Sequence, residues 1–178
     1  MIYIVCLCVA VGVIALDLIT KALAVSQNFN VEIIPELLKF KLTYNTGASF
    51  SFLADKSWAI YMFIAVTVIV CLAILAYFGY VILKKKTPSK WLLIALSMTF
   101  SGALGNMIDR LVYGKVRDFI FVFYNTDIFP AIFNVADIFL VVSVIMICIY
   151  LFFIDKDAVF KVKKKEAKTD ENTDGNGR

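Results

Sequence analysis

The sequence contains no histidine, which removes the commonest general base and the commonest nitrogen ligand of metals. Acid–base chemistry near neutral pH is left to carboxylates, lysine, tyrosine or cysteine. Cysteine is also scarce, and no Cys-x-x-Cys spacing occurs, so we expect buried apolar thiols rather than a metal site or disulfides. The four cysteines are Cys6, Cys8, Cys71 and Cys148. We expect no metal, no cofactor and no nucleic-acid partner.

Charged residues make up only 18% of the 178 residues, whereas hydrophobic residues make up 61%. Soluble domains are usually about 45–50% apolar, so the composition indicates a membrane protein. Four apolar stretches reach the length of about 20 residues that crosses a bilayer. They cover residues 2–25, 58–83, 91–112 and 132–154. Each is predicted to be a helix, because backbone groups in lipid must pair within the chain.

The first apolar stretch is expected to remain as a helix rather than to be a cleaved signal peptide. It is longer than the apolar region of a signal peptide, and no basic segment precedes it. Residues 1–155 are therefore predicted to form one compact membrane unit, and the polar residues 156–178 to form a disordered tail.

The lysines predict the orientation of the chain. Residues 84–90, between the second and third stretches, hold four lysines. The tail adds Lys156, Lys161, Lys163, Lys164, Lys165 and Lys168. Because basic loops stay in the cytoplasm, both segments and the N-terminus are placed on the cytoplasmic side, and the tail can attract anionic lipid. The connections at residues 26–57 and 113–131 then face outward.

The first outer connection carries a strand signal. Polar and apolar residues partly alternate over residues 39–44, and Asn45-Thr46-Gly47 is a turn signal. We predict a small sheet on the outer membrane surface. The expected fold is thus an all-α membrane protein of four transmembrane helices with a small extracytoplasmic β element.

Five segments bring Asp or Asn to one level near the outer side. At about 1.5 Å of rise per residue, Asp17 lies about 22 Å along the first span and Asp109 about 27 Å along the third. The fourth span enters from outside, so its first turns lie at the same depth. The residues that converge are Asp17, Asn45, Asp109, Asp118, Asn134 and Asp137. Because polar residues in spans are costly, they are functional candidates.

Spacing within the helices is consistent with this convergence. Gly102, Asn106 and Asp109 follow an i, i+4, i+7 pattern and share a face, and Gly102 and Gly105 allow another backbone to approach. Asp17 and Lys21 form an i, i+4 pair, as Asn134 and Asp137 form an i, i+3 pair.

Several of these charges have plainer interpretations. The pair Asp17–Lys21 can be structural. Arg110 is predicted to brace Asp109, and Lys115 and Arg117 are predicted to face solvent or phospholipid at the interface.

Two carboxylates in a partly desolvated site share a proton, so that one activates water while the other polarises a carbonyl group. This aspartic-protease arrangement needs no His, Ser or metal. The residues alone do not say which two acids form the pair. They also leave open a proton-coupled carrier using Asp17, Asp109 and Asp137, or a membrane scaffold without catalysis.

Four motifs occur in order on this frame: DLITK from Asp17, NTGASF from Asn45, GALGNMIDRLVYGKVRDF from Gly102 and FNVADIFL from Phe133. Together they closely resemble the bacterial lipoprotein signal peptidases, the type II signal peptidases, over roughly residues 1–155. The segment before the Gly-Asn pair often reads Gly-Gly-Ala in that family, whereas Ser101 precedes Gly102 here.

The resemblance implies an intramembrane aspartic endopeptidase of the bacterial cytoplasmic membrane. Such enzymes cleave diacylglyceryl-modified prolipoproteins just before the lipidated cysteine, have an outer β-cradle and a peripheral helix, and are inhibited by globomycin. The catalytic pair corresponds to Asp118 and Asp137. The supporting positions correspond to Asp17, Lys21, Asn45, Gly102, Asn106, Asp109, Arg110 and Asn134.

Overall fold

The computed structural model describes residues 1–46, 58–124 and 131–155. Four helices run through it: α1 (Ile2–Ser26), α2 (Ala59–Leu83), α3 (Lys90–Tyr113) and α4 (Val135–Ile149), the last continued by the π-helical turn η2 (Tyr150–Ile154). Four strands complete it: β1 (Asn30–Ile34), β2 (Leu38–Asn45), β3 (Val116–Val122) and β4 (Ala131–Phe133). The predicted tail at 156–178 and the turn at Gly47 lie outside the described residues, as does any peripheral helix within residues 47–57.

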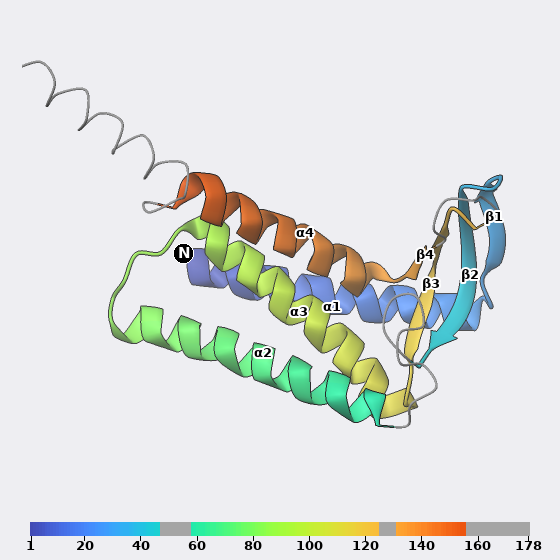
Figure 1. The fold of residues 1–178 in the computed structure, drawn as a ribbon, viewed down its shortest axis with the longest axis horizontal. Helices are drawn as coiled ribbons and strands as arrows, with labels where there is room; N and C mark the ends of the chain where they lie inside the picture. Colours follow the sequence, from blue (N-terminus) through green and yellow to red (C-terminus); the bar gives the residue numbers. More distant parts are fainter. Residues whose placement is uncertain (47–57, 125–130, 156–178) are drawn as a thin grey trace, which may run out of the picture.

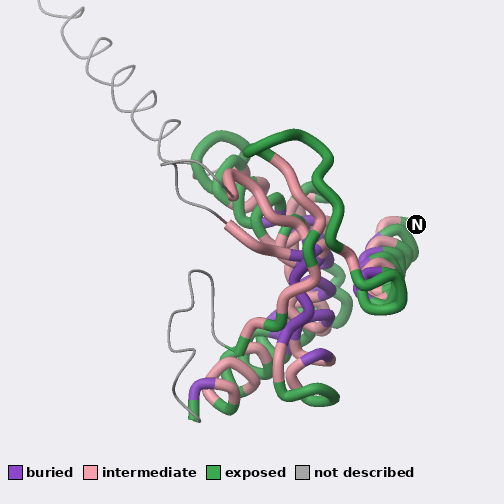
Figure 2. Tube along the Cα trace, turned by 90° about the vertical axis from the view of Figure 1, so that its right-hand side faces the viewer, coloured by how far each residue is buried: buried purple, intermediate pink, exposed green. Residues whose placement is uncertain are grey.

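The helices form a bundle around α3 (Figure 1). All four are long and apolar enough to cross a membrane. Helix α3 is the most buried of them, because α1, α2 and α4 all pack against it. Buried residues follow the centre of the bundle, whereas exposed ones cover much of its outside (Figure 2). Large exposed apolar side chains such as Leu7, Ile69 and Val141 are typical of a surface that faces lipid.

The strands form one antiparallel sheet in the order β1-β2-β3-β4 at one end of the bundle (Figure 1). Strand β2 confirms the strand predicted from the alternation at residues 39–44. The pairing of Thr43 with Asp118 places Asp118 inside strand β3. The connection at 113–131, for which no strand was predicted, supplies β3, and β4 begins at its end.

The fourth helix begins later than the apolar run suggested. Residues 132–133 belong to β4, and Phe133 pairs with Ile120 of β3. Asn134 then caps α4. Its side chain accepts a hydrogen bond from the backbone N–H of Asp137 at 3.1 Å, and the Asp137 carboxylate accepts one from the N–H of Asn134 at 3.1 Å. This capping box fixes both side chains at the end of the helix that faces the sheet.

The other end of the bundle holds the N-terminus, the connection between α2 and α3, and the end of η2 (Figure 1). These are the segments that the lysines placed together on one side of the membrane. The sheet lies at the opposite end, so the arrangement agrees with the predicted topology. Which end faces the cytoplasm stays a prediction.

The cysteines are free thiols, as expected, but two of them are not buried. Cys6 and Cys71 are buried, whereas Cys8 and Cys148 are exposed on the outside of the bundle. The expectation of four buried thiols was therefore wrong for these two. An apolar thiol is as well placed against lipid as in a protein core.

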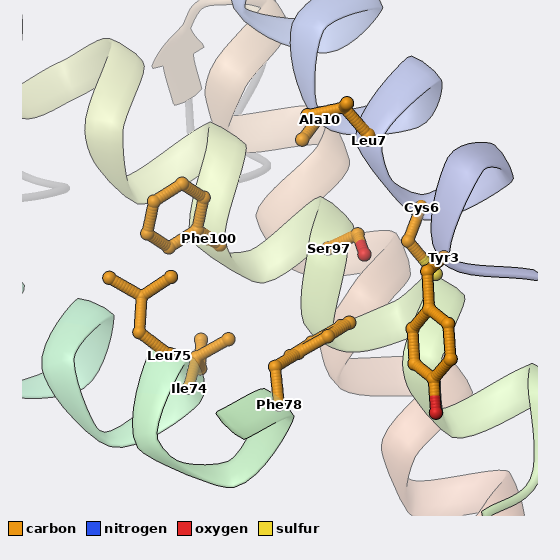
Figure 3. Close-up of a pocket in the computed structure, with 9 residues that line it drawn as sticks. All are labelled: Tyr3, Cys6, Leu7, Ala10, Ile74, Leu75, Phe78, Ser97 and Phe100. Atoms are coloured by element: carbon orange, nitrogen blue, oxygen red, sulfur yellow. The ribbon is translucent and has the colours of Figure 1, made fainter. Parts of the chain in front are cut away.

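An apolar cavity of about 210 Å³ lies between α1, α2 and α3 in the half of the bundle away from the sheet (Figure 3). Its lining includes Tyr3, Phe78 and Phe100. The Ser97 hydroxyl, which also borders it, donates to the carbonyl of Leu93 in its own helix at 2.8 Å. No carboxylate lines this cavity, so the predicted chemistry belongs at the other end of the bundle.

Two glycines let α3 approach its neighbours closely. A Cβ atom at Gly102 would lie 2.8 Å from the carbonyl oxygen of Ala136 and 2.9 Å from Cγ of Leu140. At Gly105 it would lie 2.6 Å from Oδ2 of Asp17. The close approach that the sequence predicted is therefore present, at Gly102 against α4 and at Gly105 against α1.

Gly102→Ala is expected to lower the free energy of unfolding by about 1–3 kcal/mol, because the α4 backbone must shift to admit the methyl group. The matched control is Gly79→Ala in α2, where no atom lies within 4 Å of the added Cβ. Thermal unfolding in detergent measures both. Equal melting temperatures for the two variants would disprove the close contact.

Candidate active site

The predicted polar residues meet where the helices reach the sheet. Helix α1 supplies Asp17 and Lys21, and α3 supplies Asn106 and Asp109. Strand β2 ends at Asn45, and β3 carries Asp118. Helix α4 supplies Asn134 and Asp137. All of these except Asn45 and Asp137 are buried. The convergence that the topology predicted is therefore present.

One part of the site is a compensated cluster of charges. Lys21 Nζ lies 2.7 Å from Oδ2 of Asp17 and 3.6 Å from Oδ2 of Asp109. Arg117 Nη2 lies 2.6 Å from Oδ1 of Asp109, and both Nε and the backbone N–H of Arg117 donate to Oδ2 of Asp109 at 3.1 and 2.9 Å. Two carboxylates thus face two cations, which is the condition for burying charge away from water. We call Asp17, Lys21, Asp109 and Arg117 the charge cluster.

The charge cluster also fixes the start of α4. Oδ1 of Asp17 accepts a hydrogen bond from the backbone N–H of Ala136 at 2.9 Å. That N–H belongs to the first turn of α4, where backbone donors have no partner within the helix. A residue of α1 therefore holds the helix that carries Asp137.

Arg117 was predicted to face solvent or lipid, and this was wrong, since only 6% of its surface is exposed. The reason is the chain reversal at Gly114, which ends α3 with φ of 67°, a left-handed conformation that favours glycine. The reversal turns the start of β3 back towards the last turns of α3, so Arg117 reaches Asp109. Lys115 is half-buried, with Nζ 3.8 Å from the centre of the Tyr44 ring. Gly114, which ends the helix between Asp109 and Arg117, was the sequence signal for this contact.

Arg117 braces Asp109 directly, a role that we predicted for Arg110. The guanidinium of Arg110 lies over the Phe63 ring of α2, 5.0 Å from its centre. Its Nη1 donates to the backbone carbonyl of Asn106 at a long 3.4 Å. Arg110 borders the same cavity as Asp118 and Asp137, so its positive charge acts on the two acids.

Asp118 and Asp137 are each held by amide groups. Nδ2 of Asn134 donates to Oδ1 of Asp118 at 2.6 Å, and Nδ2 of Asn45 donates to Oδ2 at 3.0 Å. Nδ2 of Asn106 donates to Oδ1 of Asp137 at 2.8 Å, while Oδ2 accepts from the backbone of Asn134. Every carboxylate oxygen of the two acids therefore has a donor, which fixes both groups in place.

Two cavities reach Asp137. One, of about 210 Å³, is bordered by both acids together with Asn45, Asn106 and Arg110, and is partly polar. The other, of about 410 Å³, runs along β4 and α4, and all its lining residues except Asp137 are apolar. Asp137 thus lies between the partly polar cavity and the apolar cavity beside α4.

Burial, followed by the negative charge of Asp137, raises the pKa of Asp118 from 3.8 to about 6. The hydrogen bonds from Asn45 and Asn134 act in the opposite direction but do not cancel this effect. Asp118 therefore keeps a proton at a much higher pH than an ordinary aspartate. A carboxyl group that keeps its proton near neutral pH can act as a general acid. Within the described residues, no group of three or more Cys, Asp or Glu is arranged to hold a metal ion.

Arg117→Met is expected to lower the free energy of unfolding by about 3–5 kcal/mol, because it leaves Asp109 buried with too little positive charge. Lys115→Met is the control, since it removes a partly exposed lysine with a cation–π contact that contributes only about 0.5–1 kcal/mol. Thermal unfolding of both variants in the same detergent makes the comparison. A loss in Lys115→Met as large as in Arg117→Met would show that the charge cluster is not a stabilising unit.

The chain is similar to known proteins of one family. The model of the family described as "Signal peptidase (SPase) II" matches residues 9–153. The lipoprotein signal peptidase of Pseudomonas aeruginosa is 38% identical over 149 residues, covering 81% of this chain and 85% of that protein. That of Ectopseudomonas mendocina is 35% identical over 156 residues, covering 85% and 90%.

Solved structures give the same relationship. One, described as "Bacterial membrane enzyme structure by the in meso method at 2.3 A resolution", superposes with a TM-score of 0.69 at 33% identity, covering 83% of this chain and 87% of that chain. A second, described in the same words at 1.9 A, gives 0.68 at 32% identity, covering 85% and 94%. The shared fold, the extent of the match and the identity together show that this membrane protein belongs to the signal peptidase II family.

Proposed function

We propose that this protein is an aspartic endopeptidase that removes signal peptides from prolipoproteins, with Asp118 and Asp137 as its catalytic residues. The observation that carries the proposal is the pair of acids on one cavity, each oxygen bound by a donor, one of them with a raised pKa. The relatives named lipoprotein signal peptidase support the substrate class.

In the proposed mechanism Asp137 is the base and Asp118 the acid. Ionised Asp137 takes a proton from a water molecule, whose oxygen attacks the scissile carbonyl carbon. Protonated Asp118 donates a hydrogen bond to the carbonyl oxygen, which gains negative charge. Collapse of the tetrahedral intermediate breaks the C–N bond, and the proton that Asp137 took from water passes to the leaving nitrogen. Arg110 borders the cavity and adds positive charge where the oxyanion forms.

The proposed substrate is a prolipoprotein whose cysteine carries diacylglycerol, cleaved just before that cysteine. Two features of the structure support this substrate. The acids lie at the end of the bundle where the helices meet the sheet, opposite the lysines at 84–90 (Figure 1). The apolar cavity beside β4 and α4 opens next to Asp137, so an apolar chain can lie beside the reacting bond.

The proposed location is the cytoplasmic membrane of a bacterium, with both termini in the cytoplasm and the active site near the outer face. The basic residues at the opposite end favour this orientation. Contacts with phospholipid follow from the apolar bundle surface. Globomycin-type compounds are the expected inhibitors, by the resemblance to lipoprotein signal peptidases.

Asp118→Asn and Asp137→Asn are each expected to lower kcat by about 10²- to 10⁴-fold or more, because each removes one partner of the acid–base pair. The assay is cleavage of a diacylglyceryl-modified prolipoprotein in detergent, with and without globomycin, and circular dichroism checks folding. Glu36→Gln is the control, an exposed acid near the sheet. Normal cleavage by either Asp variant rules out the two-acid mechanism.

Asp118→Asn is also expected to stabilise the protein at pH 7.5. The folded pKa of about 6 exceeds the ordinary value of 3.8, so the folded state binds the proton more tightly. The contribution of this bound proton to the stability of the folded protein is fully present below about pH 4 and is lost as the pH rises to 6. The wild type is then about 3 kcal/mol less stable than with an unshifted group.

Thermal unfolding of wild type and Asp118→Asn at pH 4.5 and 7.5 measures this effect. The advantage of the variant should be present at pH 7.5 and shrink towards pH 4.5, whereas Glu36→Gln should show no such change. An advantage that grows on acidification would contradict the raised pKa.

A further inference from the structure

The side-chain amide of Asn106 lies between the charge cluster and the catalytic pair. Its Oδ1 accepts hydrogen bonds from Nζ of Lys21 at 3.0 Å and from Nδ2 of Asn134 at 3.1 Å. Its Nδ2 donates to Oδ1 of Asp137 at 2.8 Å. One amide therefore connects a buried ammonium group to a catalytic carboxylate.

The opposite orientation of this amide is unfavourable. A flip would point its NH₂ group at Nζ of Lys21 and at the amide of Asn134, and its oxygen at the carboxylate of Asp137. Asn134 cannot turn to compensate, because its Oδ1 is already bound by the backbone N–H of Asp137. An ammonium group can only donate, so Lys21 selects the orientation that presents a donor to Asp137.

Lys21 does not act on the substrate directly. It is fully buried and does not border the cavity that holds the two acids. Its ammonium charge also acts on Asp118, whose pKa it lowers, but the contact through which Lys21 reaches Asp137 is the Asn106 amide.

We infer that Lys21 is a positioning residue of this active site, which holds the Asn106 amide so that its NH₂ group binds the ionised carboxylate of Asp137. This inference rests on the proposed function. It gives Lys21 a role in catalysis that is separate from its part in the charge cluster. The lysine thereby keeps the base of the pair in place to take the proton of water.

A purely structural role makes a different prediction. Lys21 also compensates Asp17 at 2.7 Å and Asp109 at 3.6 Å, while Arg117 compensates Asp109 from the other side. If compensation were its whole role, removing the charges of Asp17 and Lys21 together would restore both stability and rate. If Lys21 also orients Asn106, stability returns and the rate does not.

The test compares Lys21→Met with the double variant Asp17→Asn/Lys21→Met. Thermal stability and the kinetics of prolipoprotein cleavage are measured in detergent, well below each melting temperature. The double variant is expected to recover most of the stability lost in Lys21→Met. Its kcat stays about 10- to 100-fold below the wild type, as for loss of a hydrogen bond to a charged group, and KM is unchanged. Lys41→Met, an exposed lysine of β2, is the control and keeps wild-type kinetics.

A double-mutant cycle that includes Asn106→Leu tests the inference without relying on the recovery of stability. If Lys21 acts through Asn106, adding Lys21→Met to Asn106→Leu in the Asp17→Asn background lowers kcat little further. Full recovery of kcat in Asp17→Asn/Lys21→Met, or additive losses in the cycle, overturns the inference. Either result leaves the proposed function standing while wild type cleaves and Asp118→Asn does not. If the wild type cleaves no prolipoprotein, the proposed function itself fails.

Discussion

The burial of Lys21 among carboxylates is the constraint on which the site depends. A fully buried ammonium group is very costly unless opposite charges surround it, and Asp17 and Asp109 meet this need. Each of these acids in turn binds a further element: Asp17 holds the first turn of α4, and Asp109 holds Arg117 of β3. The same cluster that neutralises the lysine therefore joins α1, α3, α4 and the sheet, and these elements carry the two catalytic candidates.

The polar site changes in character along its depth. The charge cluster is buried, and its charges compensate one another. Next come the amides of Asn106 and Asn134, which are neutral and each bind one carboxylate of the proposed catalytic pair. Asp118 and Asp137 lie beyond them on the cavity, where burial raises the pKa of Asp118 to about 6. The neutralised charge cluster thus supports a pair of acids that can share a proton near neutral pH.

Hydropathy and spacing predicted much of this arrangement. The four spans follow from the length of apolar runs, and the convergence of Asp17, Asp109 and Asp137 follows from topology and the rise of a helix. The role of Arg117 was not predicted, because it depends on a chain reversal at Gly114 that brings together residues on an α-helix and a strand. Which two acids form the pair came from the resemblance to a family, not from the residues.

The predicted boundaries were wrong where two environments, such as a strand and a helix or lipid and protein core, favour the same apolar side chain. Ile132 and Phe133 are as apolar as the helix that follows, and only pairing with β3 makes them a strand. Cys8 and Cys148 are apolar enough for a core, yet they lie on the outside of the bundle. Hydropathy alone cannot separate a lipid-facing position from a buried one, since neither is in water.

The central claim is that Asp118 and Asp137 together carry out hydrolysis beside a lipidated cysteine. Mass spectrometry of the products formed in ¹⁸O-labelled water tests it most directly. With the wild type, the account predicts a released signal peptide with one ¹⁸O at its new carboxyl end and a mature chain that begins with the diacylglyceryl cysteine. Formation of the same products by a folded Asp118→Asn/Asp137→Asn variant at the wild-type rate would contradict it.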